Sequence, residues 1–209
     1  MGSMTEHAER EKNRARRGPV TSQLVLVAQG WMARALQAGD IAVDATAGNG
    51  VDTAFLAGCV GAAGRVYAFD VQPIALEETA RRLAAAASAE RVTLVNAGHE
   101  TLRDHIPQES HGKIRGVMFN LGYLPGGDVS ITTQVETTLA ALEQACDCLA
   151  PGGLITAVRY TGHSGGREES DAVAAWAATL EGGVFHVLEC SYLNQNKMPP
   201  ELLCIEKRG

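Results

Sequence analysis

"DATAGNGVDT" occupies residues 44–53 of this 209-residue chain. It follows the apolar run 41–43 and leads into the apolar segment 54–60, so a buried strand, a glycine turn and a helix are expected in succession. In such a unit the helix N-terminus and the exposed backbone of the glycines face a ligand. The turn therefore predicts a nucleotide-type ligand at the end of the first strand.

Apolar runs that suit strands alternate with amphipathic segments along the chain. The predicted strands cover residues 41–45, 64–71, 91–97, 113–125, 153–160, 184–193 and 201–207. The predicted helices cover residues 21–40, 51–61, 73–87, 132–153 and 168–183. This order predicts an α/β fold with a seven-stranded, mostly parallel sheet and helices on both faces. The last two strands follow each other directly, which predicts one antiparallel strand at or near an edge.

Two helices carry more detailed expectations. The segment 73–87 opens with proline at a helix start, and its apolar stripe is predicted to comprise Leu76, Ala80, Leu83 and Ala87. In the segment 132–153, Thr133 and Glu136 have the spacing of a capping box. The stripe predicted for that helix comprises Val135, Leu139, Leu142, Cys146 and Leu149.

Charge is unevenly distributed along the chain. The net charge is −6, and residues 1–18 hold five Lys or Arg against three Glu, so they carry +2 and the remainder −8. An acidic body argues against a large non-specific nucleic-acid surface but leaves room for a small, shape-selected RNA site. We expect residues 1–18 to form a basic tail and residues 19–209 a single domain.

The remaining composition narrows the class of protein. There is no run of 18 apolar residues and no apolar segment of a signal peptide near the first residue, so we expect a cytoplasmic protein without a membrane partner. The five cysteines contain no C-x-x-C pair, so we expect free thiols and no metal site.

Three kinds of ligand compete for the glycine turn. A phosphate-binding P-loop needs a lysine after its glycines, and none follows here. A dinucleotide fingerprint needs G-x-G-x-x-G, but Thr53 occupies the third glycine position. S-adenosylmethionine is the third candidate: its methionine end is a zwitterion, so Asp44 can serve the ammonium, and the backbone N–H groups of the turn can face the carboxylate.

An S-adenosylmethionine site assigns further residues. Asp70 ends the second strand and can accept both ribose hydroxyls, with Gln72 beside it, although an NAD site would also use an acidic residue there. His99 follows the third strand, where adenine would lie. Asp52 suits either a ligand contact or compensation of the helix N-terminus. The predicted cofactor-binding residues are Asp44, Thr46, Gly48, Asn49, Gly50, Asp52, Thr53, Asp70, Gln72, His99 and Asn120.

The ends of the later strands supply candidate catalytic and substrate-binding residues. Asn120 offers an amide carbonyl, Tyr123 an aromatic face and Asp128 a carboxylate, so these three are the predicted catalytic residues. In an open α/β sheet such loops gather at the carboxyl ends of the strands. The predicted substrate-binding residues are Tyr160, His163, Asn194 and Asn196.

Several segments together resemble the YtqB/MnmM family of class I methyltransferases, long described as rRNA methylases. The resemblance spans roughly residues 24–207 and rests on "DATAGNGVDTAFLA", "NAGHETL", "FNLGYLPGGDVSITT", "GGLITAVRYTGHSGGREE" and "NQNKMPPELLCIEK". The stretch N-L-G-Y, residues 120–123, is similar to the N-P-P-Y motif of amine methyltransferases but lacks both prolines.

The resemblance implies a Rossmann-like fold and S-adenosylmethionine as cofactor. It implies methylation of the 5-aminomethyl amine on wobble uridine 34 of tRNA, with the anticodon loop as partner. Three alternatives remain open: methylation of rRNA or another nucleic acid, an NAD-dependent oxidoreductase, and a non-catalytic binding module. A homodimer is also left open.

Overall fold

We describe a computed structural model of the chain over residues 24–195 and 197–209. The predicted tail 1–18 and Asn196 lie outside the described residues. The helices are α2 (Leu24–Ala35), α3 (Val51–Val60), α4 (Pro73–Ala85), α5 (Leu102–His105), α6 (Val135–Cys148) and α7 (Gly166–Ala177), with short 3-10 turns at Ala89–Arg91, His99–Thr101 and Gln108–Ser110. The strands are β1 (Ile41–Asp44), β2 (Arg65–Phe69), β3 (Val92–Val95), β4 (Ile114–Leu121), β5 (Leu149–Arg159), β6 (Phe185–Cys190) and β7 (Glu201–Lys207).

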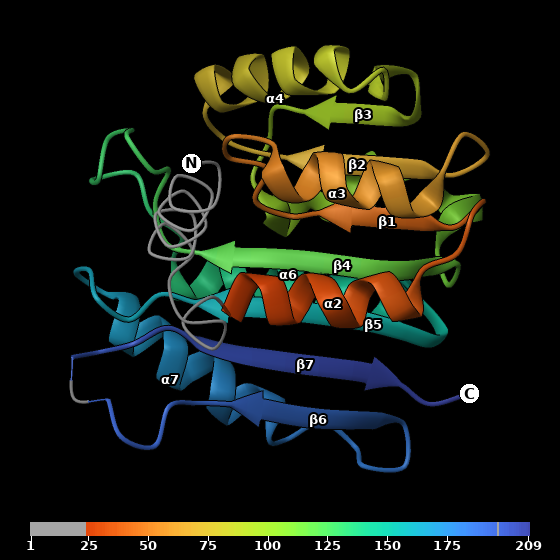
Figure 1. Cartoon of the computed structure of the whole chain (residues 1–209). Helices are drawn as coiled ribbons and strands as arrows, with labels where there is room; N and C mark the ends of the chain where they lie inside the picture. Colours follow the sequence, from red (N-terminus) through yellow and green to blue (C-terminus); the bar gives the residue numbers. More distant parts are fainter. Residues whose placement is uncertain (1–23, 196) are drawn as a thin grey trace, which may run out of the picture.

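The seven strands form one sheet in the order β3-β2-β1-β4-β5-β7-β6. Strands β1 to β5 pair in parallel, whereas β7 runs antiparallel to both β5 and β6 (Figure 1). The predicted mostly parallel sheet with one antiparallel strand is therefore confirmed, and β7 lies one place in from the edge. A dinucleotide-binding sheet has the order 3-2-1-4-5-6 instead, so the topology differs from that of the NAD-dependent alternative.

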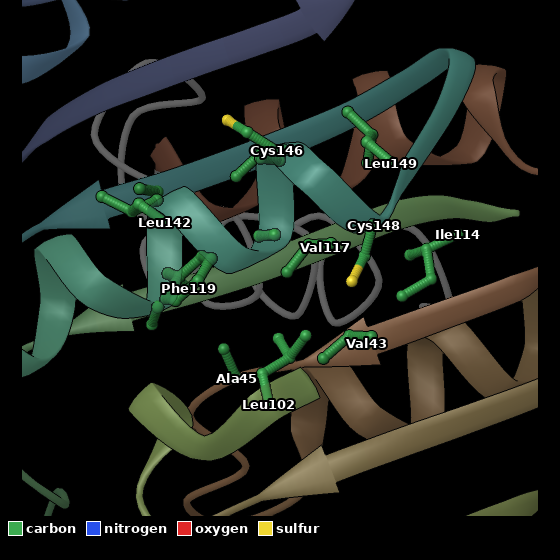
Figure 2. Close-up of a cluster of buried hydrophobic side chains, with 14 of the residues drawn as sticks. Val43, Ala45, Leu102, Ile114, Val117, Phe119, Leu142, Cys146, Cys148 and Leu149 are labelled. Carbon is green, nitrogen blue, oxygen red and sulfur yellow. The ribbon is translucent and has the colours of Figure 1, made fainter. Parts of the chain in front are cut away.

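Two apolar layers cover the two faces of the sheet. Helices α2 and α3 pack on one face through a cluster that includes Met32 and Leu56, while α6 and α7 pack on the other (Figure 1). On the second face, Leu142 and Cys146 of α6 lie over Val117 and Phe119 of β4 (Figure 2). The side chains of both layers are buried, and their packing holds the strand ends and the loops that follow them in fixed positions.

Helix α4 corrects one expectation. Leu76 and Leu83 are buried as predicted, but Ala80 and Ala87 are exposed. The buried face is completed by Thr79, whose hydroxyl donates to the carbonyl of Gly48 at 3.1 Å. The helix turns this polar side chain toward the glycine turn, and it ends before Ala87 is reached.

Helix α6 and strand β5 also begin where the pattern did not place them. Gln134 precedes α6 and makes no side-chain cap among the described residues. The expected capping box is wrong because the hydroxyl of Thr133 donates to Glu169 on α7 instead, at 2.7 Å. Strand β5 begins at Leu149 rather than 153, because the segment that looked like a helix end pairs with β4.

Chemical features of the described residues bear on the class of protein. All five cysteines are free thiols. No helix in residues 24–195 and 197–209 is long and apolar enough to cross a membrane. Within the same residues, no group of three or more His, Cys, Asp or Glu side chains is arranged to hold a metal ion.

Candidate active site

The glycine turn after β1 lies directly against α4. Gly48 and Gly50 have φ values of 52° and 73°, in the left-handed region that favours glycine. A Cβ at Gly50 would stand 2.8 Å from both Cα and Oγ1 of Thr79. The turn can therefore keep its shape only with glycine at this position, and its backbone stays open toward the cleft.

Asp44, at the end of β1, is completely buried beneath the turn. Its carboxylate accepts a hydrogen bond of 2.6 Å from the hydroxyl of Thr53 and one of 3.2 Å from the backbone N–H of Thr46. Thr53 is the residue that replaces the third glycine of a dinucleotide fingerprint, so the departure has a structural reason. Burial, reinforced by the charge of Asp52, raises the pKa of Asp44 to about 7.

Asp70, at the end of β2, joins two turns. Its two carboxylate oxygens accept hydrogen bonds from the backbone N–H groups of Gly48 and Gln72, each at 2.9 Å. An ionised carboxylate has about four acceptor positions, so two hydroxyl groups of a ligand can still be bound. Gln72 precedes α4 and makes no side-chain cap among the described residues, so its amide is available to the same cavity.

His99 lies in the turn after β3, buried and edge-on to the ring of Phe119, with ring centroids 5.8 Å apart. Its Nδ1 is 3.2 Å from the carbonyl oxygen of Ala45. Because a carbonyl only accepts, we assign the proton to Nδ1, which leaves Nε2 as an acceptor. Burial lowers the pKa of His99, which favours this neutral form.

Asn120, near the end of β4, is held by both of its nitrogen groups. Its backbone N–H donates to the hydroxyl of Thr46 at 2.7 Å, and its side-chain Nδ2 donates to Asp52 at 2.6 Å. Asp52 also accepts from Nε2 of Gln29 on α2. In contrast, Oδ1 of Asn120 is buried and has no hydrogen-bond partner among the described residues. A buried acceptor without a donor is costly, by about 1–3 kcal/mol, so a ligand that brings a donor would be favoured.

Two cavities meet at the carboxyl ends of the strands. The smaller, about 300 Å³, contains Asp70, Gln72 and His99 in its wall. The larger, about 710 Å³, contains Tyr160 and His163. The wall that both cavities share, which we call the shared wall, consists of Thr46, Gly48, Asn120, Gly122, Tyr123 and Pro125. A small molecule in one cavity would thus meet a group in the other beside Asn120.

Aromatic side chains form one side of the larger cavity. The rings of Tyr123 and His163 meet edge to face, with centroids 5.8 Å apart. Tyr160 is 40% exposed, and burial raises the pKa of its hydroxyl, with a smaller contribution from the charge of Asp52. A phenol that stays neutral and two flat rings suit the faces of a planar base.

Two predicted residues, Asp128 and Asn194, are not brought to the cleft. Asp128 lies on an exposed loop outside both cavity walls described, and its carboxylate accepts from the N–H and hydroxyl of Ser130. Those two bonds lower its pKa, which makes it a poor proton acceptor. Asn194 is exposed and also absent from the two described walls, and Asn196 lies outside the described residues.

Other residues reach the cleft without having been predicted. Met198 and Pro200, from the β6–β7 connection, line the larger cavity, and the hydroxyl of Thr161 donates to the carbonyl of Met198 at 3.0 Å. Val25, also in the wall of the larger cavity, comes from α2, which the sequence marked only as an amphipathic helix. No local sequence pattern distinguishes these residues, because they reach the cleft only through the packing of segments that are far apart in the sequence. The loop "NQNKMPPE", residues 194–201, was the one available signal.

The sheet order, the antiparallel β7 and the glycine turn after β1 define the fold of a class I S-adenosylmethionine-dependent methyltransferase. The model of a family described as "Putative rRNA methylase" matches residues 66–206. Because this match spans more than half of the chain, the chain belongs to that family.

A named relative and two solved structures agree with this family assignment. A protein of Arabidopsis thaliana, named tRNA (mnm(5)s(2)U34)-methyltransferase, chloroplastic, is 41% identical over 181 residues, or 83% of this chain. The chain spans 65% of the length of that plant protein.

Two solved structures cover nearly the same region. A "putative rRNA-methylase" from Clostridium thermocellum is 42% identical with a TM-score of 0.84, covering 88% of this chain and 96% of that one. A "putative methyltransferase" from Streptococcus mutans, solved in complex with SAH, is 36% identical with a TM-score of 0.79, covering 88% and 97%.

Proposed function

We propose that this protein uses S-adenosylmethionine to methylate the 5-aminomethyl amine of wobble uridine 34 in tRNA. The observation that carries the proposal is Asn120, a residue of the shared wall whose Oδ1 is a buried acceptor with no donor among the described residues. An amine is a donor of the required kind. The name of the Arabidopsis relative, a tRNA (mnm(5)s(2)U34)-methyltransferase, supports this choice of RNA and position.

The residues of the smaller cavity fit S-adenosylmethionine. Asp70 would accept the ribose hydroxyls, Nε2 of His99 would accept from the adenine amino group, and the turn at Gly48 would bring backbone close to the methionine end. Asp44 would balance the ammonium, directly or through water. The Streptococcus mutans relative was solved in complex with SAH, which supports the choice of cofactor. When bound, the cofactor supplies a methyl group on a positively charged sulfur.

Chemistry at the amine needs a neutral nitrogen. If its pKa is close to that of lysine, about 10.4, deprotonation at pH 7 costs roughly 4–5 kcal/mol. Asn120 would accept one N–H, which aims the nitrogen lone pair at the methyl carbon. The new N–C bond forms as the C–S bond breaks, sulfur keeps the electron pair, and the product ammonium releases a proton to water. Holding the reacting groups in line can supply on the order of 7–11 kcal/mol.

The larger cavity would hold the wobble base. Anticodon-loop bases are already unpaired, so moving one into a pocket costs little. Tyr123 and Tyr160 would contact the base faces, with His163 behind Tyr123. The walls of both cavities come from one chain, so the proposal requires no second copy. An enzyme that modifies tRNA must be located with its tRNA substrate. We therefore propose that the protein is cytoplasmic.

Nucleoside mass spectrometry after incubation with S-adenosylmethionine tests the proposal. Full-length tRNA that carries 5-aminomethyluridine at position 34 should gain one methyl group on that nucleoside, and rRNA should gain none. The description of the family as rRNA methylases makes rRNA the matched comparison. Methylation of rRNA with inert tRNA would overturn the proposed substrate. A thermal shift with SAH but not with NAD is also expected, and the reverse ranking would overturn the proposed cofactor.

A further inference from the structure

The two ends of the Asn120 amide differ chemically, and only one of them suits the acceptor amine. Oδ1 accepts hydrogen bonds, whereas Nδ2 donates two. Nδ2 is bonded to Asp52, so Oδ1 is the end of the amide that has no partner among the described residues. Rotation by half a turn would exchange the two ends and offer Nδ2, which would compete with the amine as a donor. The direction of this amide therefore matters for the proposed reaction, and something in the protein must fix it.

Asp52 is placed to fix that direction. One of its oxygens accepts from Nδ2 of Asn120 at 2.6 Å, and the other accepts from Nε2 of Gln29 at 2.5 Å. The residue is only 5% exposed, so water does not replace these donors freely. A carboxylate has no N–H to offer, so it bonds the NH₂ end of Asn120 and rejects the carbonyl end. Asp52 lines the larger cavity and is absent from the described wall of the smaller one, which would hold the cofactor, so a direct role in holding the cofactor is not favoured.

We propose that Asp52, supported by Gln29, is a positioning residue that sets the Asn120 amide with Oδ1 toward the shared wall and thereby selects acceptor nitrogens that carry an N–H. This inference rests on the proposed methylation of an amine. It extends across three segments: Gln29 on α2, Asp52 on α3 and Asn120 on β4. An acceptor without a hydrogen on its nitrogen would leave Oδ1 without a partner and should react poorly.

Replacing Asp52 by Asn gives a specific test. The side chain keeps its shape, but an amide can donate as well as accept, so it no longer selects the NH₂ end of Asn120. A chain of three amides can be hydrogen-bonded in two senses, and one of them turns Nδ2 of Asn120 toward the shared wall. We expect Asp52→Asn to lower kcat about twofold, since only one sense is productive. Asp52→Ala removes the partner altogether, and a misplaced group of this kind can lower kcat by ten- to a hundredfold.

The measurements are kcat with the 5-aminomethyl tRNA and the dissociation constant of SAH by calorimetry. We expect kcat to follow the order wild type, Asp52→Asn, Asp52→Ala, while the SAH constant changes less than threefold. Asp104→Ala is the matched control, because it removes the same charge from exposed α5, outside the two cavity walls described. An Asp52→Ala variant that keeps kcat, or that loses SAH binding in parallel with kcat, overturns the inference.

A second readout does not depend on any RNA. The side-chain NH₂ signals of Asn120, identified by their loss in Asn120→Ala, should show slow exchange with water in the wild type and fast exchange in Asp52→Ala. Unchanged protection in Asp52→Ala overturns the positioning role even if kcat falls. If the wild type transfers no methyl group to the tRNA, the proposed function fails, and these signals still decide the role of Asp52.

Discussion

The backbone N–H of Gly48 donates a 2.9 Å hydrogen bond to a carboxylate oxygen of Asp70. This bond joins the glycine turn after β1 to the end of β2, two segments that are 22 residues apart in sequence. The other oxygen of Asp70 accepts from the N–H of Gln72 at 2.9 Å. The carboxylate is thus oriented before any ligand arrives, which lowers the cost of binding one.

Replacing Asp70 by Ala should weaken SAH binding strongly. Each charge-assisted hydrogen bond to a ribose hydroxyl contributes about 1.5–3 kcal/mol, so loss of even one raises the dissociation constant at least about tenfold. Isothermal calorimetry measures the change. Asp70→Asn keeps one acceptor oxygen and should fall between the wild type and Asp70→Ala. An unchanged constant in Asp70→Ala would show that the ribose lies elsewhere.

The raised pKa of Asp44 predicts pH-dependent cofactor affinity. With a pKa of about 7, Asp44 is largely protonated at pH 6 and ionised at pH 8 in the free protein. The ammonium of SAH favours the ionised carboxylate, so the dissociation constant should decrease as the pH rises from 6 to 8. The Asp44→Asn variant keeps an acceptor for Thr53 and should show a flatter profile. Parallel profiles for the two proteins would exclude Asp44 as the partner of the ammonium.

The same group has the opposite effect on the free protein. Because its folded pKa of about 7 lies above the unfolded value of 3.8, Asp44 contributes stability that is complete below the unfolded pKa and is lost as the pH rises toward 7. Asp44→Asn should therefore raise the melting temperature of the ligand-free protein more at pH 8 than at pH 4. Calorimetric unfolding at the two pH values measures this difference, and an equal shift at both would contradict the assignment.

Replacing Asn120 by Ala should affect turnover more than cofactor binding. The backbone N–H that donates to Thr46 is retained in this variant, so the glycine turn keeps its support. The lost side chain acts on the acceptor nitrogen, and we expect kcat to fall ten- to a hundredfold with little change in the SAH constant. Turnover kinetics gives kcat, and calorimetry gives the dissociation constant of SAH. The placement of Asn120 at the reacting amine fails if kcat holds while only the SAH constant rises.

Two glycines in the same region should respond in opposite ways to alanine. Gly50 has a φ of 73°, and a Cβ there would come within 2.8 Å of Thr79, so Gly50→Ala should destabilise the protein by at least about 1–3 kcal/mol. Gly58 is exposed within α3, and among the described residues nothing lies within 4 Å of an added Cβ. Gly58→Ala should therefore stabilise by up to about 1 kcal/mol. Urea titration of both variants checks the pair, and a shift in the same direction for both would contradict the argument.

The fold could be predicted because strand and helix patterns alternate along the chain, and each pattern is visible within a short stretch of sequence. The sequence placed Asp44, Asp70 and Asn120 at one edge of the sheet for a related reason: each ends, or nearly ends, a buried strand, and parallel strands end at one edge. Their roles at the site stay predictions. The sequence misplaced Ala80 and Ala87, because a polar Thr79 faces the glycine turn, and no apolar pattern reveals such a contact.

The parts of the cleft that the sequence missed depend on contacts between distant segments. Gln29 reaches Asp52 across 23 residues, and Thr161 reaches Met198 across 37. Asp128 looked like a catalytic carboxylate beside "GYLPGG", yet it closes its own turn through Ser130. Short polar motifs indicate that a loop is present, whereas the direction of each side chain is set by packing that the motif does not contain.

The most direct test of the central claim uses an anticodon stem-loop that carries 5-aminomethyluridine at position 34. Incubated with the protein and S-adenosylmethionine, it should yield the 5-methylaminomethyl nucleoside by mass spectrometry. A matched stem-loop with unmodified uridine at position 34 should gain no methyl group, because it offers no amine to Asn120. A stem-loop that remains inert under conditions in which rRNA is methylated would contradict the account.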